Sequence, residues 1–94
     1  MKTLRIKYEN LEHAGFDGGG TEILHHQGKP FTGICLIYED AGWLSLEKEF
    51  QDGYQEGWVR LYYENGQLEE EYFMHNNIMD PDLGGAWDEE GNPR

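Results

Sequence analysis

The sequence contains a single cysteine, few cations and no long hydrophobic run. Cys35 cannot form a disulfide within the chain, so the fold does not depend on an oxidising compartment. No stretch approaches the ~18 consecutive apolar residues of a membrane-spanning helix. The residues that follow Met1 alternate between polar and apolar and lack the apolar segment of a secretory signal. These absences predict a soluble protein of the cytoplasm.

The composition favours strands and turns over helices. Thirteen glycines, six tyrosines, three tryptophans and four phenylalanines suit short strands joined by turns, and the 3.6-residue periodicity of a long amphipathic helix is missing. Ninety-four residues are enough for one small domain, which is expected to bury about 60% of the surface that its unfolded chain exposes. We therefore predict a mainly β protein in which residues 1–94 form a single small domain.

An Asn-Gly pair at residues 65 and 66 lies between two runs of residues that favour strands, 58–63 and 67–74. Asparagine and glycine both tolerate the positive φ angles of a tight two-residue turn, so this arrangement is a strong indication of a β-hairpin. With such a turn, the cross-strand pairs would be Tyr63 with Leu68, Leu61 with Glu70, and Arg60 with Glu71. A three-residue turn with a bulge would shift this register by one residue.

The hairpin is one copy of a repeat. Shifting the chain by 24 residues places 33–42 over 57–66 with glycines, aromatics and aliphatics aligned, and a degraded third copy, 87–92, follows at a shift of 25. A short fixed period indicates one supersecondary unit that packs against the next copy. We predict a meandering antiparallel sheet of repeated β-hairpins. Its parts are N-terminal strands and a glycine-rich loop in 1–30, two 24-residue hairpin repeats in 31–76, and a degraded capping repeat in 77–94.

Residues 2–8 alternate between polar and apolar side chains. Leu4, Ile6 and Tyr8 would lie on one side and the cations on the other, which predicts a half-buried strand. A strand that carries cations has an obvious packing partner in an acidic sheet, so we expect this strand to lie beside the repeats.

The remaining segments have weaker patterns. Residues 9–20 are predicted to form a loop or turn cluster with a short helical turn near 11–14, and residues 21–26 are predicted to form a second strand. Residues 51–57 are predicted to link the two hairpins. Near the C-terminus, Pro81 cannot donate a ladder hydrogen bond, so residues 80–85 are predicted to replace the start of a strand in a truncated last unit.

The predicted register separates two faces of the sheet, because successive side chains of a strand point to opposite sides. The core face would contain Cys35, Ile37, Leu44, Leu46, Phe50, Val59, Leu61, Leu68, Tyr72 and Met74. The opposite face, partly exposed, would contain Ile34, Leu36, Tyr38, Trp43, Trp58, Tyr62 and Phe73 together with Glu47, Glu49, Arg60, Glu69 and Glu71. A shift of the register by one residue would mix the two sets.

The net charge of −12 is unevenly distributed. Residues 1–30 contain four cations and four acids, whereas residues 31–94 contain three cations and fifteen acids, a difference of twelve. A field of this sign repels nucleic acid and anionic membranes and accelerates association with basic proteins. We therefore expect a basic protein as partner, and neither nucleic acid nor a membrane. The alternative is that the acids only keep a sheet-rich protein soluble.

Neither a metal site nor a catalytic site is predicted. The side chains that could bind a metal are His13, His25, His26, His75 and Cys35. Adjacent histidines on a strand point to opposite faces, and no pair has the spacing of a structural zinc site. Carboxylates do occur in pairs at strand spacing, but no nucleophile, oxyanion loop or phosphate-binding glycine loop accompanies them. We expect no metal, no cofactor and no enzymatic activity.

The repeats resemble a known family. The residues that carry the resemblance are Phe31-Thr32-Gly33, Gly57-Trp58 and Tyr62-Tyr63-Glu64-Asn65-Gly66-Gln67-Leu68. With the spacing of 24 residues, they are similar to the variant MORN repeat of the bacterial YwqK-type antitoxin family. The resemblance covers residues 28–76 well, residues 77–94 poorly and residues 1–27 not at all. It implies a meander of hairpins, in a protein that binds a toxin and blocks it.

The resemblance identifies no target, because the motif residues are structural and this repeat type also occurs in scaffolding and membrane-associated proteins. The leading hypothesis is an antitoxin or immunity protein that covers the positively charged cleft of a basic toxin, with a nuclease as the first candidate. Carboxylates along a sheet can replace the phosphates that such a cleft attracts, and aromatic side chains can anchor the interface. The candidate partner-binding residues are Trp43, Glu47, Glu49, Trp58, Tyr62, Glu69 and Glu71. The alternative hypothesis is a scaffold module without a toxin partner, which would form homo-oligomers through its sheet edges.

Overall fold

The computed structural model describes residues 3–75 and 78–94, which form a single small domain of mainly β structure, as predicted. The strands are β1 (Arg5–Lys7), β2 (Glu12–Phe16), β3 (Glu22–His26), β4 (Lys29–Pro30), β5 (Gly33–Tyr38), β6 (Leu44–Gln51), β7 (Tyr54–Tyr62), β8 (Leu68–His75) and β9 (Ile78–Ala86). A short 3-10 turn, η1, spans Tyr8–Asn10. Within the described ranges no helix is long and apolar enough to cross a membrane.

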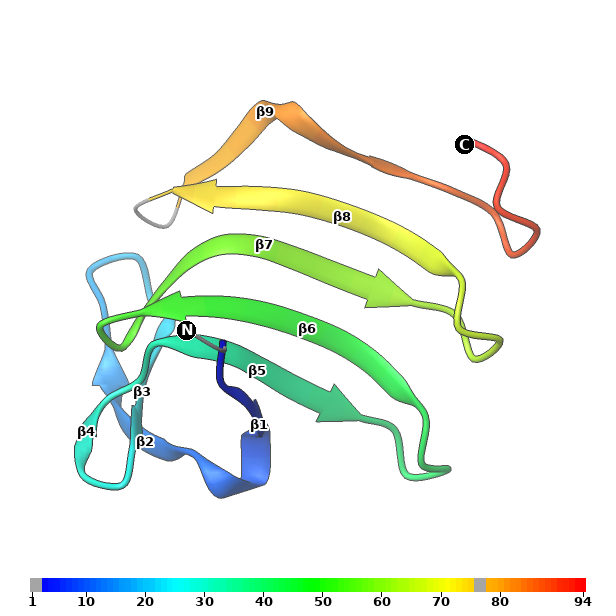
Figure 1. Ribbon diagram of the computed structural model, residues 1–94. Helices are drawn as coiled ribbons and strands as arrows, with labels where there is room; N and C mark the ends of the chain where they lie inside the picture. Colours follow the sequence, from blue (N-terminus) through cyan, green and yellow to red (C-terminus); the bar gives the residue numbers. More distant parts are fainter. Residues whose placement is uncertain (1–2, 76–77) are drawn as a thin grey trace.

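The strands form two sheets (Figure 1). The large sheet has the order β1-β5-β6-β7-β8-β9, in which β1 pairs with β5 in parallel and all the other neighbours are antiparallel. The small antiparallel sheet has the order β2-β3-β4. Two backbone hydrogen bonds join the sheets: Leu24 N–H donates to the Gly53 carbonyl (2.9 Å), and Gly53 N–H donates to the Phe31 carbonyl (2.8 Å). The predicted meander is therefore present from β5 to β9.

The core lies where the two sheets meet. Leu24 and Phe31 come from the small sheet and the segment after it, Cys35 and Phe50 come from the large sheet, and all four are at most 5% exposed. Burying each of the larger side chains stabilises the fold by roughly 1.5–3 kcal/mol. Val59 is also buried, which together with Cys35 and Phe50 confirms the predicted core face at these positions. The other members of that face are half-buried: Ile37, Leu44, Leu46, Leu61, Leu68, Tyr72 and Met74.

The hairpins of the large sheet close with a wide turn that recurs along the chain. In the turn between β5 and β6, Gly42 N–H donates to the Glu39 carbonyl (2.8 Å) and Glu39 N–H donates to the Trp43 carbonyl (2.9 Å). The same two hydrogen bonds recur in residues 63–67, 88–92 and 17–21. The glycines that provide the positive φ angle are Gly20, Gly42, Gly66 and Gly91. The copy between β2 and β3 lies in the segment with three consecutive glycines, which was predicted as a loop or turn cluster.

The turn between β7 and β8 is wider than predicted, yet the register of its strands is as predicted. The pairs predicted for Leu61 and Arg60 are both present. Next to the turn, however, Tyr62 rather than Tyr63 pairs with Leu68, which corrects the two-residue turn. The wide turn shifts the register by one residue, and an irregularity beside Tyr62 shifts it back.

Away from the turns the two faces of the sheet therefore keep their predicted composition. Beside the turns, Tyr62 pairs with Leu68 and Tyr38 pairs with Leu44, so each pair joins residues predicted for opposite faces, which is a correction. Leu36, predicted for the partly exposed face, is buried at 7% exposure.

At the opposite end of the sheet the turns are tight (Figure 1). Residues 27–28 and 52–53 have φ angles between 52° and 91°, as in the two-residue turns whose twist matches that of antiparallel strands. The pairs that close these turns are His26 with Lys29, and Gln51 with Tyr54. The segment 51–57 joins the two hairpins as predicted, but it does so through a tight turn, and β7 already begins at Tyr54.

The N-terminal third differs most from the predictions. Residues 9–20, predicted as a loop or turn cluster with a helical turn at 11–14, contain the end of η1 and all of β2, which pairs with β3. β1 is confirmed as a strand, but Leu4 and Tyr8, predicted to be half-buried, are 48% and 42% exposed. The chain leaves the sheet on both sides of β1, so of the alternating apolar residues only Ile6 packs against the core.

The structure also corrects the prediction for residues 80–85. They belong to β9, which pairs with β8. The ladder is interrupted between Asp80 and Gly84, and Pro81 lies in the interruption, in agreement with its missing N–H. β9 is therefore a complete edge strand with a bend in it, and the last unit is less truncated than the sequence predicts.

Candidate partner-binding site

Five of the seven candidate residues come together on one face of the large sheet. Glu47 of β6, Arg60 of β7 and Glu71 of β8 stand directly opposite one another in the ladder. Side chains two residues apart along a strand share a face, which adds their neighbours to the same surface. We define the central cluster as Arg5, Glu47, Glu49, Trp58, Arg60, Tyr62 and Glu71.

The Glu47 carboxylate accepts hydrogen bonds from two side chains, and the residue is only 7% exposed. Arg5 reaches across β5 from β1, and its Nη2 donates a hydrogen bond to Glu47 Oε2. The Tyr62 hydroxyl donates to the other carboxylate oxygen. Burial, and secondly this hydrogen bond, raise the pKa of Tyr62 to about 12. Both oxygens of the Glu47 carboxylate are therefore hydrogen-bonded within the protein.

The carboxylates of Glu71 and Glu49 also accept hydrogen bonds within the protein. Arg60 Nε donates to Glu71 Oε2 at 2.9 Å, and the guanidinium lies 5.2 Å from the centroid of the Trp58 ring. The Trp58 ring packs edge-on against Phe73 with 5.2 Å between centroids. Glu49 Oε1 accepts the backbone N–H of Trp58 at 2.8 Å. The acids that the sequence assigns to a partner thus hold strands β6, β7 and β8 to one another.

Trp43 and Glu69 lie outside the central cluster. Trp43 ends the wide turn before β6 and is half-buried. Glu69 is half-buried on β8, and its carbonyl accepts the backbone N–H of Trp87 at 2.8 Å. Sequence reasoning did not include Arg5 in the site, although the alternating cations of residues 2–8 predicted an acidic packing partner. That partner is Glu47.

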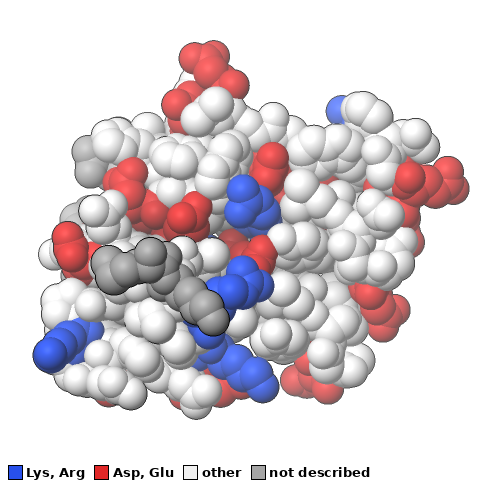
Figure 2. Space-filling view, viewed as in Figure 1, with Lys and Arg blue, Asp and Glu red and all other residues white. Residues whose placement is uncertain are grey.

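The charge on this side of the molecule is mixed rather than uniformly acidic. Figure 2 shows Lys and Arg side chains gathered near the middle of the view, with Asp and Glu side chains around them and along the margin. The two arginines of the central cluster balance the two carboxylates that they contact. The central cluster therefore contains three carboxylates and two guanidinium groups, so most of its negative charge is balanced within the protein.

Free acids are found instead at the three wide turns of the large sheet. These turns lie together at one end of the sheet, the right-hand end in Figure 1, and Figure 2 shows acidic side chains along the same margin. Asn65 Nδ2 donates to the Glu89 carbonyl at 2.9 Å and so joins two of them. We define the turn rim as the exposed acids Glu39, Asp40, Glu64, Glu89 and Glu90. Within the described ranges, no cation pairs with their carboxylates.

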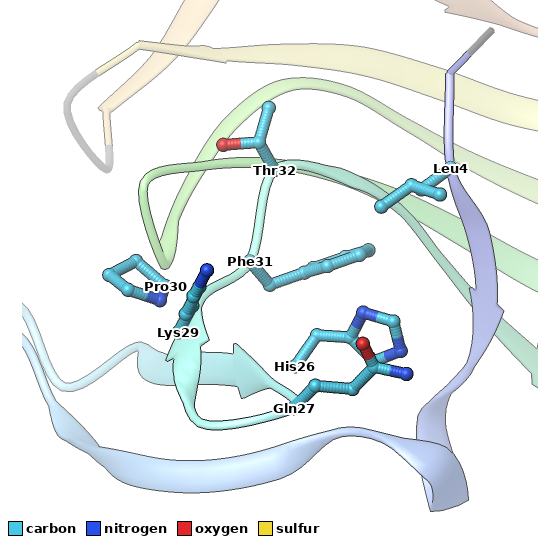
Figure 3. A pocket seen from close by; sticks show the side chains of 7 residues that line it. All are labelled: Leu4, His26, Gln27, Lys29, Pro30, Phe31 and Thr32. Carbon is cyan, nitrogen blue, oxygen red and sulfur yellow. The ribbon is translucent and has the colours of Figure 1, made fainter.

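A separate hollow of about 350 Å³ lies between the N-terminal segment and the turn that joins β3 to β4. Figure 3 shows the Phe31 ring between Leu4 and His26, and the Phe31 and His26 rings meet edge-on with 6.1 Å between centroids. The remaining lining residues are Gln27, Lys29, Pro30 and Thr32. None of the described residues that line this hollow carries a carboxylate, so this lining does not suit a cationic ligand.

Two of the four histidines lie against a glutamate carboxylate. His13 Nδ1 lies 2.6 Å from Glu22 Oε2, and His75 Nδ1 lies 2.8 Å from Glu56 Oε2. In the part of the chain that the structure describes, no three histidine, cysteine, aspartate or glutamate side chains are arranged to hold a metal ion. Cys35 is buried, and burial raises the pKa of its thiol to about 11.

Comparison with known proteins gives no match: no family model, no curated protein and no solved structure is similar to this chain. The resemblance of residues 28–76 to the variant MORN repeat stays a prediction. The structural repeat is independent of that resemblance, because the same pair of turn hydrogen bonds recurs at the spacing found in the sequence.

Proposed function

We propose that this protein is an antitoxin or immunity protein that binds and neutralises a basic toxin, with a nuclease as the first candidate. The supporting observation is the turn rim. Its five carboxylates are exposed, form no ion pair with the described cations, and belong to turns that follow one another at every second strand connection. Strands lie ~4.8 Å apart, so neighbouring turns are separated by roughly 10 Å. This row of negative charge can replace phosphates in a cationic cleft.

In this proposal the partner binds at the turn rim rather than at the central cluster. A carboxylate that is 7% exposed and holds two donors, like that of Glu47, is not free to bind a toxin. Trp43 is the one candidate aromatic that belongs to a rim turn, and its half-buried ring is suited to anchor an interface. Acids around such an anchor raise the association rate more than the final affinity.

The test is to search the neighbouring genes for one that encodes a basic protein and to measure the association of that protein with this one at several salt concentrations. Glu64→Lys should lower the association rate constant about tenfold at low salt and weaken its salt dependence. Glu9→Lys is the matched control, because Glu9 is exposed on η1 far along the chain and the substitution changes the net charge equally. Glu71 is unsuitable for this test, since its loss would leave Arg60 without its carboxylate. Equal rates for the two variants would reject the rim as the binding surface.

The second candidate function is a scaffold module that self-associates through an open sheet edge. One observation favours it: β9 is an edge strand, and three exposed apolar side chains lie on it, Ile78, Met79 and Leu83. Sedimentation velocity over a wide concentration range separates the two functions. A concentration-dependent oligomer in the absence of any basic protein would favour the scaffold.

A further inference from the structure

The bend in β9 opens a hollow against β8. Between Asp80 and Gly84, residues 81–83 have no partner in the ladder, and the strand visibly turns away from β8 there (Figure 1). Beside this bend lies a hollow of about 310 Å³. Because Pro81 cannot donate to β8, the bend is a stable feature of the strand.

The lining of this hollow combines apolar, aromatic and acidic groups. Met79 and Leu83 are 54% and 44% exposed. The half-buried Tyr72 lies on the β8 side together with Glu70. Residues 70 and 72 are two positions apart on β8, so their side chains share a face. Burial raises the pKa of Tyr72, and the charge of the Glu70 carboxylate raises it further.

Glu70 differs from the acids of the central cluster. In the described residues, no hydrogen-bond donor or cation contacts its carboxylate, whereas the neighbouring Glu71 is bound to Arg60 on the other face of the same strand. Asp80 also lines the hollow, although it pairs with Phe73 in the ladder and its Oδ1 accepts the Asp82 backbone N–H at 2.9 Å. The hollow therefore presents an aromatic ring, an apolar wall and unneutralised negative charge within one small volume.

We propose that this hollow binds an arginine side chain of a basic protein. A guanidinium can stack on the Tyr72 ring, lay its aliphatic stem along Met79 and donate to carboxylates at the same time, which a lysine ammonium does less well. The protein already contains this arrangement: Arg60 stacks on an aromatic ring and donates to a β8 carboxylate. A second copy of the chain is a poorer occupant, because it also has a net charge of −12.

This inference rests on the proposed function for the identity of the partner, but its chemistry is testable without the partner. The probe is N-acetyl-L-arginine amide, titrated into the protein while amide signals are followed by NMR. N-acetyl-L-citrulline amide is the matched probe, because it has the same shape and no charge. We expect saturable shifts at Glu70, Tyr72 and Met79, with citrulline binding at least about tenfold more weakly.

Two variants assign the site to its residues. Glu70→Gln should weaken arginine binding about fivefold or more, and Tyr72→Leu should weaken it while keeping the apolar volume. Glu9→Gln removes one charge far from the hollow and should change nothing. Shifts spread over all exposed acids, or equal affinities for Glu70→Gln and Glu9→Gln, would show unspecific attraction and overturn the proposal.

Failure of this inference can be distinguished from failure of the proposed function. If a basic partner binds through the turn rim and Glu70→Gln leaves its affinity unchanged, the hollow is rejected while the antitoxin function stands. If arginine occupies the hollow but no basic partner is found, the hollow stands without that function. A dimer that forms at NMR concentrations and buries Met79 would assign the hollow to a second copy and overturn the proposal.

Discussion

Arg5 and Glu47, which are 42 residues apart in the sequence, form a hydrogen-bonded ion pair on the face of the large sheet. The parallel pairing of β1 with β5 brings the arginine within reach, and the Tyr62 hydroxyl binds the second carboxylate oxygen. A carboxylate that would be costly to bury alone is thereby satisfied by a cation and a hydroxyl. Glu47 is consequently part of what fixes the N-terminal strand to the repeats.

The first prediction concerns this buried carboxylate. Glu47→Ala leaves the Arg5 guanidinium and the Tyr62 hydroxyl without their acceptor, so it should lower the free energy of unfolding by about 2 kcal/mol. Urea denaturation followed by tryptophan fluorescence measures the change. The control is Glu9→Ala, an exposed acid, which should stay within about 0.5 kcal/mol of the parent protein. If both substitutions have the same small effect, the cluster does not stabilise the fold.

The second prediction concerns high pH. Tyr62 loses its proton near pH 10 in the unfolded chain, whereas in the folded protein its pKa is raised to about 12 by burial and by its hydrogen bond to Glu47. The unfolded chain therefore releases this proton first, and folding stability should fall as the pH rises from about 10 to about 12. Tyr62→Phe should reduce this fall, as measured by the urea midpoint at each pH. An identical fall in both proteins would contradict the assignment.

The third prediction concerns the single thiol. Cys35 is 1% exposed and its pKa is raised to about 11 by burial, so little thiolate forms at pH 8 and reagents cannot reach it. Its reaction with Ellman's reagent should be at least about 100-fold slower in the folded protein than in urea, because it requires opening of the core. Rapid modification of the folded protein would show that the core near β5 opens readily.

The fourth prediction compares two glycines. A Cβ at Gly33 would lie 2.7 Å from the backbone oxygen of Leu4, the same oxygen that accepts the Ile34 N–H, so Gly33→Ala should displace β1 and cost about 3 kcal/mol. At Gly66 a Cβ meets no atom within 4 Å, and only the φ angle of +91° opposes it, which should cost about 1 kcal/mol. Thermal unfolding of both variants tests the order, and the reverse order would refute the close approach of β1.

The repeat could be predicted from the sequence because its determinants are local. The spacing of 24 residues and the Asn-Gly pair at 65 and 66 are sufficient to locate two hairpins and to divide their residues between two faces. β2 could not be predicted in the same way. It contains Gly15, precedes three consecutive glycines, and owes its extended form to pairing with β3.

The sequence was sufficient to predict which residues share the face of the central cluster. It was not sufficient to predict whether their carboxylates are free or bound by cations of the protein. Strand alternation places Glu47, Glu49 and Glu71 on one face, but whether these acids are free depends on where distant cations lie. Arg5 reaches Glu47 only because β1 joins the sheet in parallel beside β5, and no local pattern contains that pairing. The free acids of the turn rim follow instead from the turns themselves, whose middle residues point into solvent.

Each five-residue wide turn contains positions that hold the backbone in its turn conformation and positions whose side chains only face solvent. In the turn of residues 63–67, the backbone is held by its own hydrogen bonds and by Gly66, while the side chain of Glu64 is exposed and takes no part in them. Substitution at Glu64, or at the corresponding Asp40 and Glu89, would therefore alter the charge that the turn presents to solvent without loosening the scaffold. Under the proposed function, such substitutions would change the choice of partner one turn at a time.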